Sequence, residues 1–150
     1  MELSKEFSYL KKIFILIVSG LIVFFAIGYY LVISRGALII FSPVQLQNLE
    51  SIIILLSLIG IPAGHYYHKK RISHLSQELS GSELLKSYKV SFIVKLAILE
   101  GMALITLVGY MLSGNQTFLL IYAIFFLIVL INYPGESKLK DELNLNKEEE

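Results

Sequence analysis

The sequence contains no cysteine and few charged residues. Of its 150 residues, 17% are Asp, Glu, Lys or Arg, and the formal net charge is +1. The absence of cysteine excludes disulfide bonds, thiolate metal sites and cysteine nucleophiles, while it leaves the redox compartment unspecified. A net charge so close to zero gives no indication of nucleic-acid binding, and we expect no nucleic-acid partner.

Apolar side chains dominate the chain instead. Hydrophobic residues make up 55% of the sequence and aromatic residues 12%, and the mean hydropathy is +0.69. A soluble domain of this length could not bury so much apolar surface in one core. The composition therefore predicts an integral membrane protein that contacts the lipid bilayer.

Four apolar runs are the candidate membrane spans, at residues 13–33, 49–67, 90–112 and 116–133. A hydrocarbon core of about 30 Å requires roughly 20 helical residues, and the fourth run is short. A turn without charge at residues 113–115 separates the last two runs, and residues 134–150 form a charged tail. We predict a single all-α membrane domain over residues 1–150, a four-transmembrane-helix bundle with cytoplasmic helix extensions.

Charge placement predicts the topology. The connection over residues 68–89 is the most basic in the chain, and three lysines precede the first run. By the positive-inside rule both segments face the cytoplasm, so four spans place the N- and C-termini inside. The basic residues Lys69, Lys70 and Arg71 are candidate contacts for anionic lipid, although a topology signal explains them equally well.

Capping signals predict where two helices begin. Ser42 and Gln45 form a Ser-x-x-Gln capping box before the second run. Ser80 and Glu83 form a second capping box, so the third helix is expected to begin near Gly81.

Two pairs of small residues predict close helix packing. Gly60 and Gly64 lie four positions apart in the second run, with Pro62 between them as a predicted kink. Ala97 and Gly101 form a similar pair in the third run. We expect the two pairs to face each other where these helices cross.

Glu100 is the candidate working residue, because it lies near the middle of the third run. An ionised carboxylate at the bilayer centre is costly, so the group is expected to be neutral, paired or functional. Ser57 and Tyr122 are expected at a similar depth, where a hydroxyl could bond the carboxyl. Lys95 lies five positions before Glu100 and on another helix face, so we expect it to extend along the lipid boundary to the headgroups.

His65 and His68 lie three positions apart on one helix, but the sequence offers no third metal ligand near them. We interpret them as interfacial residues, and the sequence predicts no metal and no cofactor.

Three functions stay open. The first is a structural or accessory subunit that forms a homo-oligomer or joins other membrane subunits. The second is a proton- or cation-handling protein that uses Glu100. The third is a small membrane enzyme or lipid-binding protein, and it has the least support because the intramembrane polar side chains are few.

The second half of the chain resembles a group of small bacterial inner-membrane proteins with four spans and no established activity. The resemblance rests on residues 97–104, on residues 110–115, and on a span closed by Pro134 before a tail of Lys, Asp and Leu. It implies four helices in a bacterial inner membrane. The helix around Glu100 is also similar to the carboxylate-bearing helix of ATP synthase proteolipids, which would imply a proton site, but the glycine-rich first helix of that family is missing here.

Overall fold

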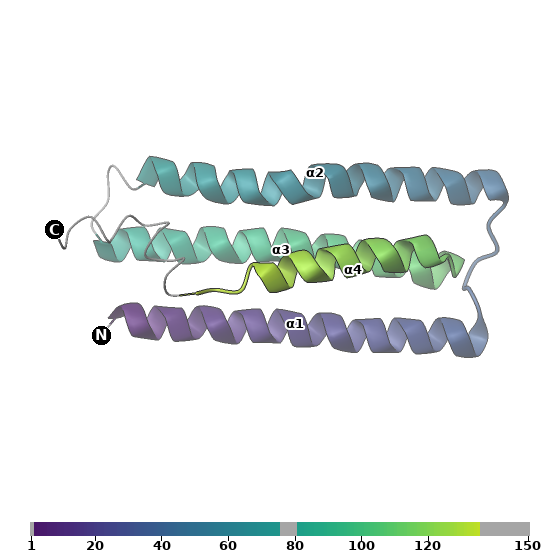
Figure 1. Cartoon of the computed structure of the whole chain (residues 1–150), viewed down its shortest axis with the longest axis horizontal. Coiled ribbons are helices and arrows are strands. Elements are labelled where there is room, and N and C mark those ends of the chain that lie inside the picture. The colour runs from purple at the N-terminus through teal and green to yellow at the C-terminus, as the bar shows by residue number, and fades with distance from the viewer. Residues whose placement is uncertain (1, 76–80, 136–150) are drawn as a thin grey trace.

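The computed structural model describes residues 2–75 and 81–135, which form four α-helices. Successive helices run in opposite directions, so that α1 and α3 are parallel to each other and antiparallel to α2 and α4 (Figure 1). The predicted all-α class is confirmed for this part of the chain. The helices are α1 (Glu2–Arg35), α2 (Pro43–Leu75), α3 (Gly81–Ser113) and α4 (Gln116–Ile131).

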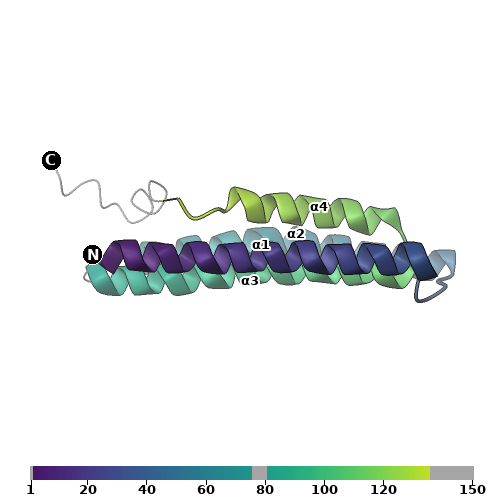
Figure 2. The same cartoon turned by 90° about the horizontal axis from the view of Figure 1, so that it is seen from below.

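Helix α3 is the centre of the bundle. It lies between α2 and α1 in Figure 1 and packs against each of the other three helices, whereas α4 lies along one side of these three (Figure 2). In the most apolar part of α3, 50% of the residues are buried, compared with 11% in α1 and in α2. The outer helices therefore expose most of their apolar surface.

Three of the helices are long and apolar enough to cross a membrane. The outward side chains are apolar, as illustrated by Leu16 and Leu58, which are 73% and 67% exposed. Lipid accepts such a surface, whereas water does not. Helix α4 is also apolar, but its 16 residues extend only about 24 Å. The three candidate spans are Phe7–Arg35, Pro43–Ser73 and Glu83–Ser113.

Positive charge gathers at one end of the bundle, where α1 begins, α2 ends and α3 begins (Figure 1). At the opposite end, the charged side chains among the described residues are those of Arg35 and Glu50. Such an asymmetry is typical of the two faces of a membrane protein. The cations of the basic end include Lys11, Lys12, Lys69, Lys70, Arg71, Lys86 and Lys89.

The predicted capping box at the start of α2 is confirmed. The backbone N–H of Ser42 donates to Gln45 Oε1 at 3.0 Å, and the N–H of Gln45 donates to Ser42 Oγ at 3.4 Å. Helix α2 continues through Pro62. Helix α3 begins at Gly81 as predicted, and Ser80 of the second capping box lies outside the described residues.

The connection between α1 and α2 forms hydrogen bonds with the C-terminal end of α3. Gly36 has φ +82°, a conformation that glycine adopts without a steric penalty. The N–H groups of Leu38 and Ile39 then donate to the carbonyls of Met111 and Leu112 at 3.1 and 2.9 Å. These bonds satisfy carbonyls that have no partner within the last turn of a helix.

A tight turn joins α3 to α4, as the sequence predicts. Gly114 has φ +68°, and Asn115 Oδ1 accepts from the Thr117 N–H at 2.9 Å, which caps α4. The Asn115 side chain also donates to Glu50 on α2. The same residue therefore caps α4 and joins it to α2.

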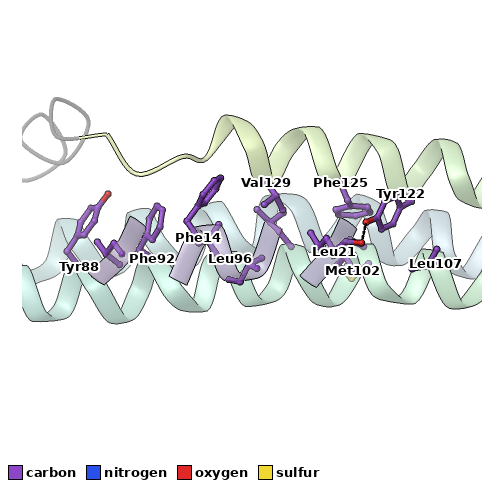
Figure 3. Close-up of a cluster of buried hydrophobic side chains, with 14 of the residues drawn as sticks. Phe14, Leu21, Tyr88, Phe92, Leu96, Met102, Leu107, Tyr122, Phe125 and Val129 are labelled. Carbon is purple, nitrogen blue, oxygen red and sulfur yellow. Dashed lines mark hydrogen bonds between the residues drawn. The ribbon is translucent and has the colours of Figure 1, made fainter. Parts of the chain in front are cut away.

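Helix α4 buries one stripe of side chains against the rest of the bundle. Phe125 and Val129 are fully buried and point toward Leu21 and Leu96 in Figure 3. Because residues three and four positions apart share one helix face, this spacing gives α4 a single packing surface. The stripe consists of Phe118, Tyr122, Phe125 and Val129.

The contact between α2, α3 and α4 predicts the effect of Gly109→Val. A Cβ at Gly109 would lie 2.8 Å from Ile53 Cδ1 and 3.2 Å from Phe118 Cδ1. Overpacking should lower the free energy of unfolding by about 1–3 kcal/mol, measured by circular dichroism in mild detergent. Gly101→Ala is the control, since a Cβ there meets nothing within 4 Å. Equal stability of Gly109→Val and wild type would contradict this packing.

Candidate functional site

Glu100 lies near the middle of α3 on the side that faces α1. Leu107, which is seven positions further along and therefore on the same helix face, packs at Gly28 of α1, where a Cβ would lie 3.3 Å from Leu107 Cδ1. Glu100 is partly exposed. Its carboxyl group makes no hydrogen bond or ion pair with any residue of the described ranges 2–75 and 81–135.

Small residues lie at the level of Glu100 on α1 and α3. Gly28 of α1 meets Leu107 and Met111 of α3. Because α1 and α3 are parallel, Gly20, which is eight positions before Gly28, lies level with residues 99–103 of α3. A Cβ at Gly20 or at Gly101 would have nothing within 4 Å. We call this surface the Glu100 face, which consists of Gly20, Ala97, Glu100 and Gly101.

The structure does not bring the three predicted polar side chains together. Ser57 is buried and its hydroxyl donates to the carbonyl of Ile53 at 2.7 Å. Tyr122 is buried and its hydroxyl donates to the carbonyl of Leu21 on α1 at 2.8 Å (Figure 3). Both hydroxyl protons are therefore engaged away from Glu100.

The glycines of α2 do pack against α3, but on a face different from the predicted one. A Cβ at Gly60 would lie 2.9 Å from Met102 Cγ, and a Cβ at Gly64 would lie 3.6 Å from Lys95 Cγ. Long side chains of α3 therefore fill the space at these glycines. The predicted crossing is wrong in this respect, because another side of α3 carries Ala97, which is exposed, and Gly101.

Lys95 is buried, and the expectation that it lies along the lipid boundary is wrong. Its side chain is only 5% exposed, and Nζ lies 5.2 Å from the centre of the Phe92 ring. The lysine stem occupies the space at Gly64. Lys95 thus belongs to the contact between α2 and α3.

A second polar contact lies beside Lys95. The buried His68 ring has Nδ1 2.9 Å from Ser91 Oγ and packs against Phe92, with ring centres 6.0 Å apart. Ser91 Oγ also lies 2.9 Å from the Tyr88 carbonyl oxygen, so the imidazole, the hydroxyl and the carbonyl form one chain of polar contacts. The sequence did not predict this cluster of His68, Ser91 and Lys95. The only signal was the spacing of Ser91 and Lys95, which lie four positions apart and therefore on one face of α3.

The basic residues at the end of α2 pair with tyrosines. Arg71 Nη1 donates to the Tyr67 hydroxyl at 2.7 Å, and Lys70 Nζ lies 5.8 Å from the centre of the Tyr66 ring. Lys69 is exposed. Tyrosines and basic residues together are typical of a membrane interface, and the contact with anionic lipid stays a prediction.

His65 and His68 point in different directions. His65 is exposed and its Nδ1 lies 3.1 Å from the Ile61 carbonyl, whereas His68 is buried against α3. Within the described residues, no group of three or more His, Cys, Asp or Glu side chains is arranged to hold a metal ion. The two histidines therefore have separate environments.

An open apolar groove of about 280 Å³ lies between α1 and α4. Tyr122 contributes to its lining, and the hydroxyl of this residue is bonded to the Leu21 carbonyl. The groove therefore suits hydrocarbon, such as an acyl chain, better than a polar molecule. Its lining residues are Ile22, Phe25, Leu119, Tyr122, Ala123 and Phe126.

Comparisons of the chain with protein-family models, with curated proteins and with solved structures find no match. The resemblances to small four-span bacterial proteins and to ATP synthase proteolipids therefore stay predictions.

Because the Tyr122 hydroxyl bonds to the Leu21 carbonyl rather than to Glu100, we predict that substitutions of Tyr122 and Glu100 act independently. Tyr122→Phe removes one hydrogen bond and should lower the free energy of unfolding by about 1 kcal/mol. Combined with Glu100→Gln, the two effects should add to within about 0.5 kcal/mol, because the side chains share no partner. Unfolding of the wild type, both single variants and the double variant in mild detergent measures this coupling. A coupling well above that value would mean that the two groups interact.

Proposed function

We propose that this chain is a four-span protein of a bacterial inner membrane, with both ends in the cytoplasm. The basic end of the bundle supports this orientation, since α1 begins and α2 ends there. Helix α4 runs alongside α1 and α3 and is the proposed fourth span. Its length of about 24 Å is short for a bilayer, and local thinning of the bilayer accommodates a difference of this size at modest cost.

The proposed activity is that of a structural or accessory subunit in a membrane complex. The observation that carries it is the partly exposed carboxyl group of Glu100, which has no partner within the described chain and lies near mid-span. Lipid offers no hydrogen bonds to such a group. A neighbouring subunit would cover it, and the small residues of the Glu100 face allow another helix to approach closely.

Proton or cation handling is the second candidate function. It is favoured by two observations on residues 2–75 and 81–135: none of them makes a competing hydrogen bond to Glu100, and space is open at Gly20 and Gly101. A group in this position could exchange a proton if water reached it. The two functions differ in what Glu100→Gln does, because glutamine keeps hydrogen-bonding capacity but cannot carry a proton reversibly.

Cysteine labelling tests the topology, and the absence of native cysteine makes single-cysteine variants clean. Lys12→Cys and Gly135→Cys should react with a membrane-impermeant maleimide only after the cells are opened. Ser34→Cys and Gln116→Cys should react on intact cells. Labelling of Lys12→Cys and Gly135→Cys from opposite sides would exclude an even number of spans.

Substitution of Glu100 tests the subunit role. Glu100→Leu should weaken association by about 3- to 20-fold, the equivalent of one intramembrane hydrogen bond, whereas Glu100→Gln should keep most of it. Native gel electrophoresis of membranes solubilised in mild detergent measures the size of the complex. Leu16→Ala on the exposed side of α1 is the control.

Proton flux in reconstituted vesicles separates the two candidate functions. Loss of flux in Glu100→Gln, together with a complex of unchanged size, would favour proton handling over the subunit role.

A further inference from the structure

His65 carries a ring nitrogen that has no partner within the described chain. A carbonyl oxygen only accepts hydrogen bonds, so the contact of Nδ1 with the Ile61 carbonyl at 3.1 Å places the proton on Nδ1 in the neutral ring. The other nitrogen, Nε2, is then an acceptor, and the side chain is exposed. Among the described residues no atom bonds Nε2.

His65 lies at nearly the same depth as Glu100. Its neighbour Gly64 packs against Lys95 and Ile98 of α3, whereas Gly60 packs against Met102. Because α2 and α3 are antiparallel (Figure 1), His65 is level with about residues 95–98. Glu100 is then roughly 5 Å away along the bundle axis, a difference that two side chains can bridge.

The two groups are separated within one copy of the chain. Helices α1 and α2 lie on opposite sides of α3 (Figure 1), and Glu100 faces α1 whereas His65 belongs to α2. Seven positions before His65, and therefore on the same helix face, Leu58 is 67% exposed. His65 thus lies on an outward apolar face of α2.

We propose that copies of this chain associate side by side, with His65 of one copy bonded to Glu100 of the next. The neutral carboxyl group donates its proton to Nε2, or an imidazolium donates from Nε2 to the carboxylate. In both forms the pair shares one proton and has no net charge, which is the arrangement that hydrocarbon tolerates. The small residues of the Glu100 face admit the approaching α2.

Such a contact joins two different surfaces, so it is heterologous. A heterologous contact repeats from copy to copy, and a closed ring uses every surface. A second copy is the occupant that the observations favour, because one chain supplies both the carboxyl group and the imidazole at matching depth. This inference rests on the proposed subunit role and names the partner.

Disulfide cross-linking between two single-cysteine chains tests the contact. Leu58→Cys lies two turns from His65 on the same face of α2, and Leu104→Cys lies one turn from Glu100 on α3. Co-expressed, the two chains should form a disulfide-linked dimer after mild oxidation of membranes, and neither chain alone should do so. Leu127→Cys, exposed on α4, should give no dimer with Leu104→Cys.

Exchange of the two side chains gives a second readout. Glu100→His or His65→Glu alone places two like groups opposite each other and should lower the yield of cross-linked dimer about tenfold. The double variant exchanges the pair and should restore the yield to near the unsubstituted level. A merely structural requirement for either residue would not produce this rescue.

Each outcome supports or overturns the contact. Dimers from Leu104→Cys alone, or a yield that is insensitive to both exchanges, would overturn it. If Glu100→Leu still reduces the size of the native complex while no dimer forms, the subunit role stands and the partner is another protein. If the complex size is also insensitive to Glu100, both proposals fail.

Discussion

The lack of hydrogen-bond partners in the interior of a bilayer is the constraint on which this structure depends. Lipid tails offer neither donors nor acceptors, so each polar side chain at that depth needs a protein partner. Ser57, Thr106 and Tyr122 solve this by donating to backbone carbonyls. Among the buried side-chain nitrogen and oxygen atoms of the described chain, each has a hydrogen-bond partner. Glu100 is partly exposed and has no such partner among the described residues, which is the observation behind the proposed contact between copies.

The central position of α3 explains the distribution of polar groups. Ser91, Lys95 and Thr106 are buried in α3, and α2 contacts the first two of them, through His68 and Gly64. At Gly20 and Gly101, by contrast, an added Cβ would meet nothing within 4 Å. A helix surrounded on several sides can carry polar residues, whereas the outer faces of α1 and α2 are apolar. The fold therefore leaves Glu100 at the border between a shielded and an unshielded side.

Local signals in the sequence predict the starts of α2 and α3 and the turn before α4 correctly, because their chemistry involves neighbours in the chain. The end of α2 was not predicted, since the helix continues to Leu75, beyond the apolar run that ends at residue 67. The reciprocal bonds of Ser42 and Gln45 and the turn at Gly114 are of this kind. Helix faces were harder to predict. Helix α3 is apolar on nearly all sides, so no amphipathic pattern distinguishes its packed faces from its exposed one. The position of Lys95 along the bundle axis was therefore predictable, but the direction in which its side chain points was not.

The glycine pairs illustrate the same limit in more detail. A small residue signals that something approaches closely, yet it does not specify what approaches. At Gly60 and Gly64 the approaching groups are the side chains of Met102 and Lys95, rather than another small residue. At Gly101 an added Cβ would have no atom of the described residues within 4 Å. In the proposed assembly, this open position beside a carboxyl group that has no partner among the described residues is where the neighbouring copy would pack.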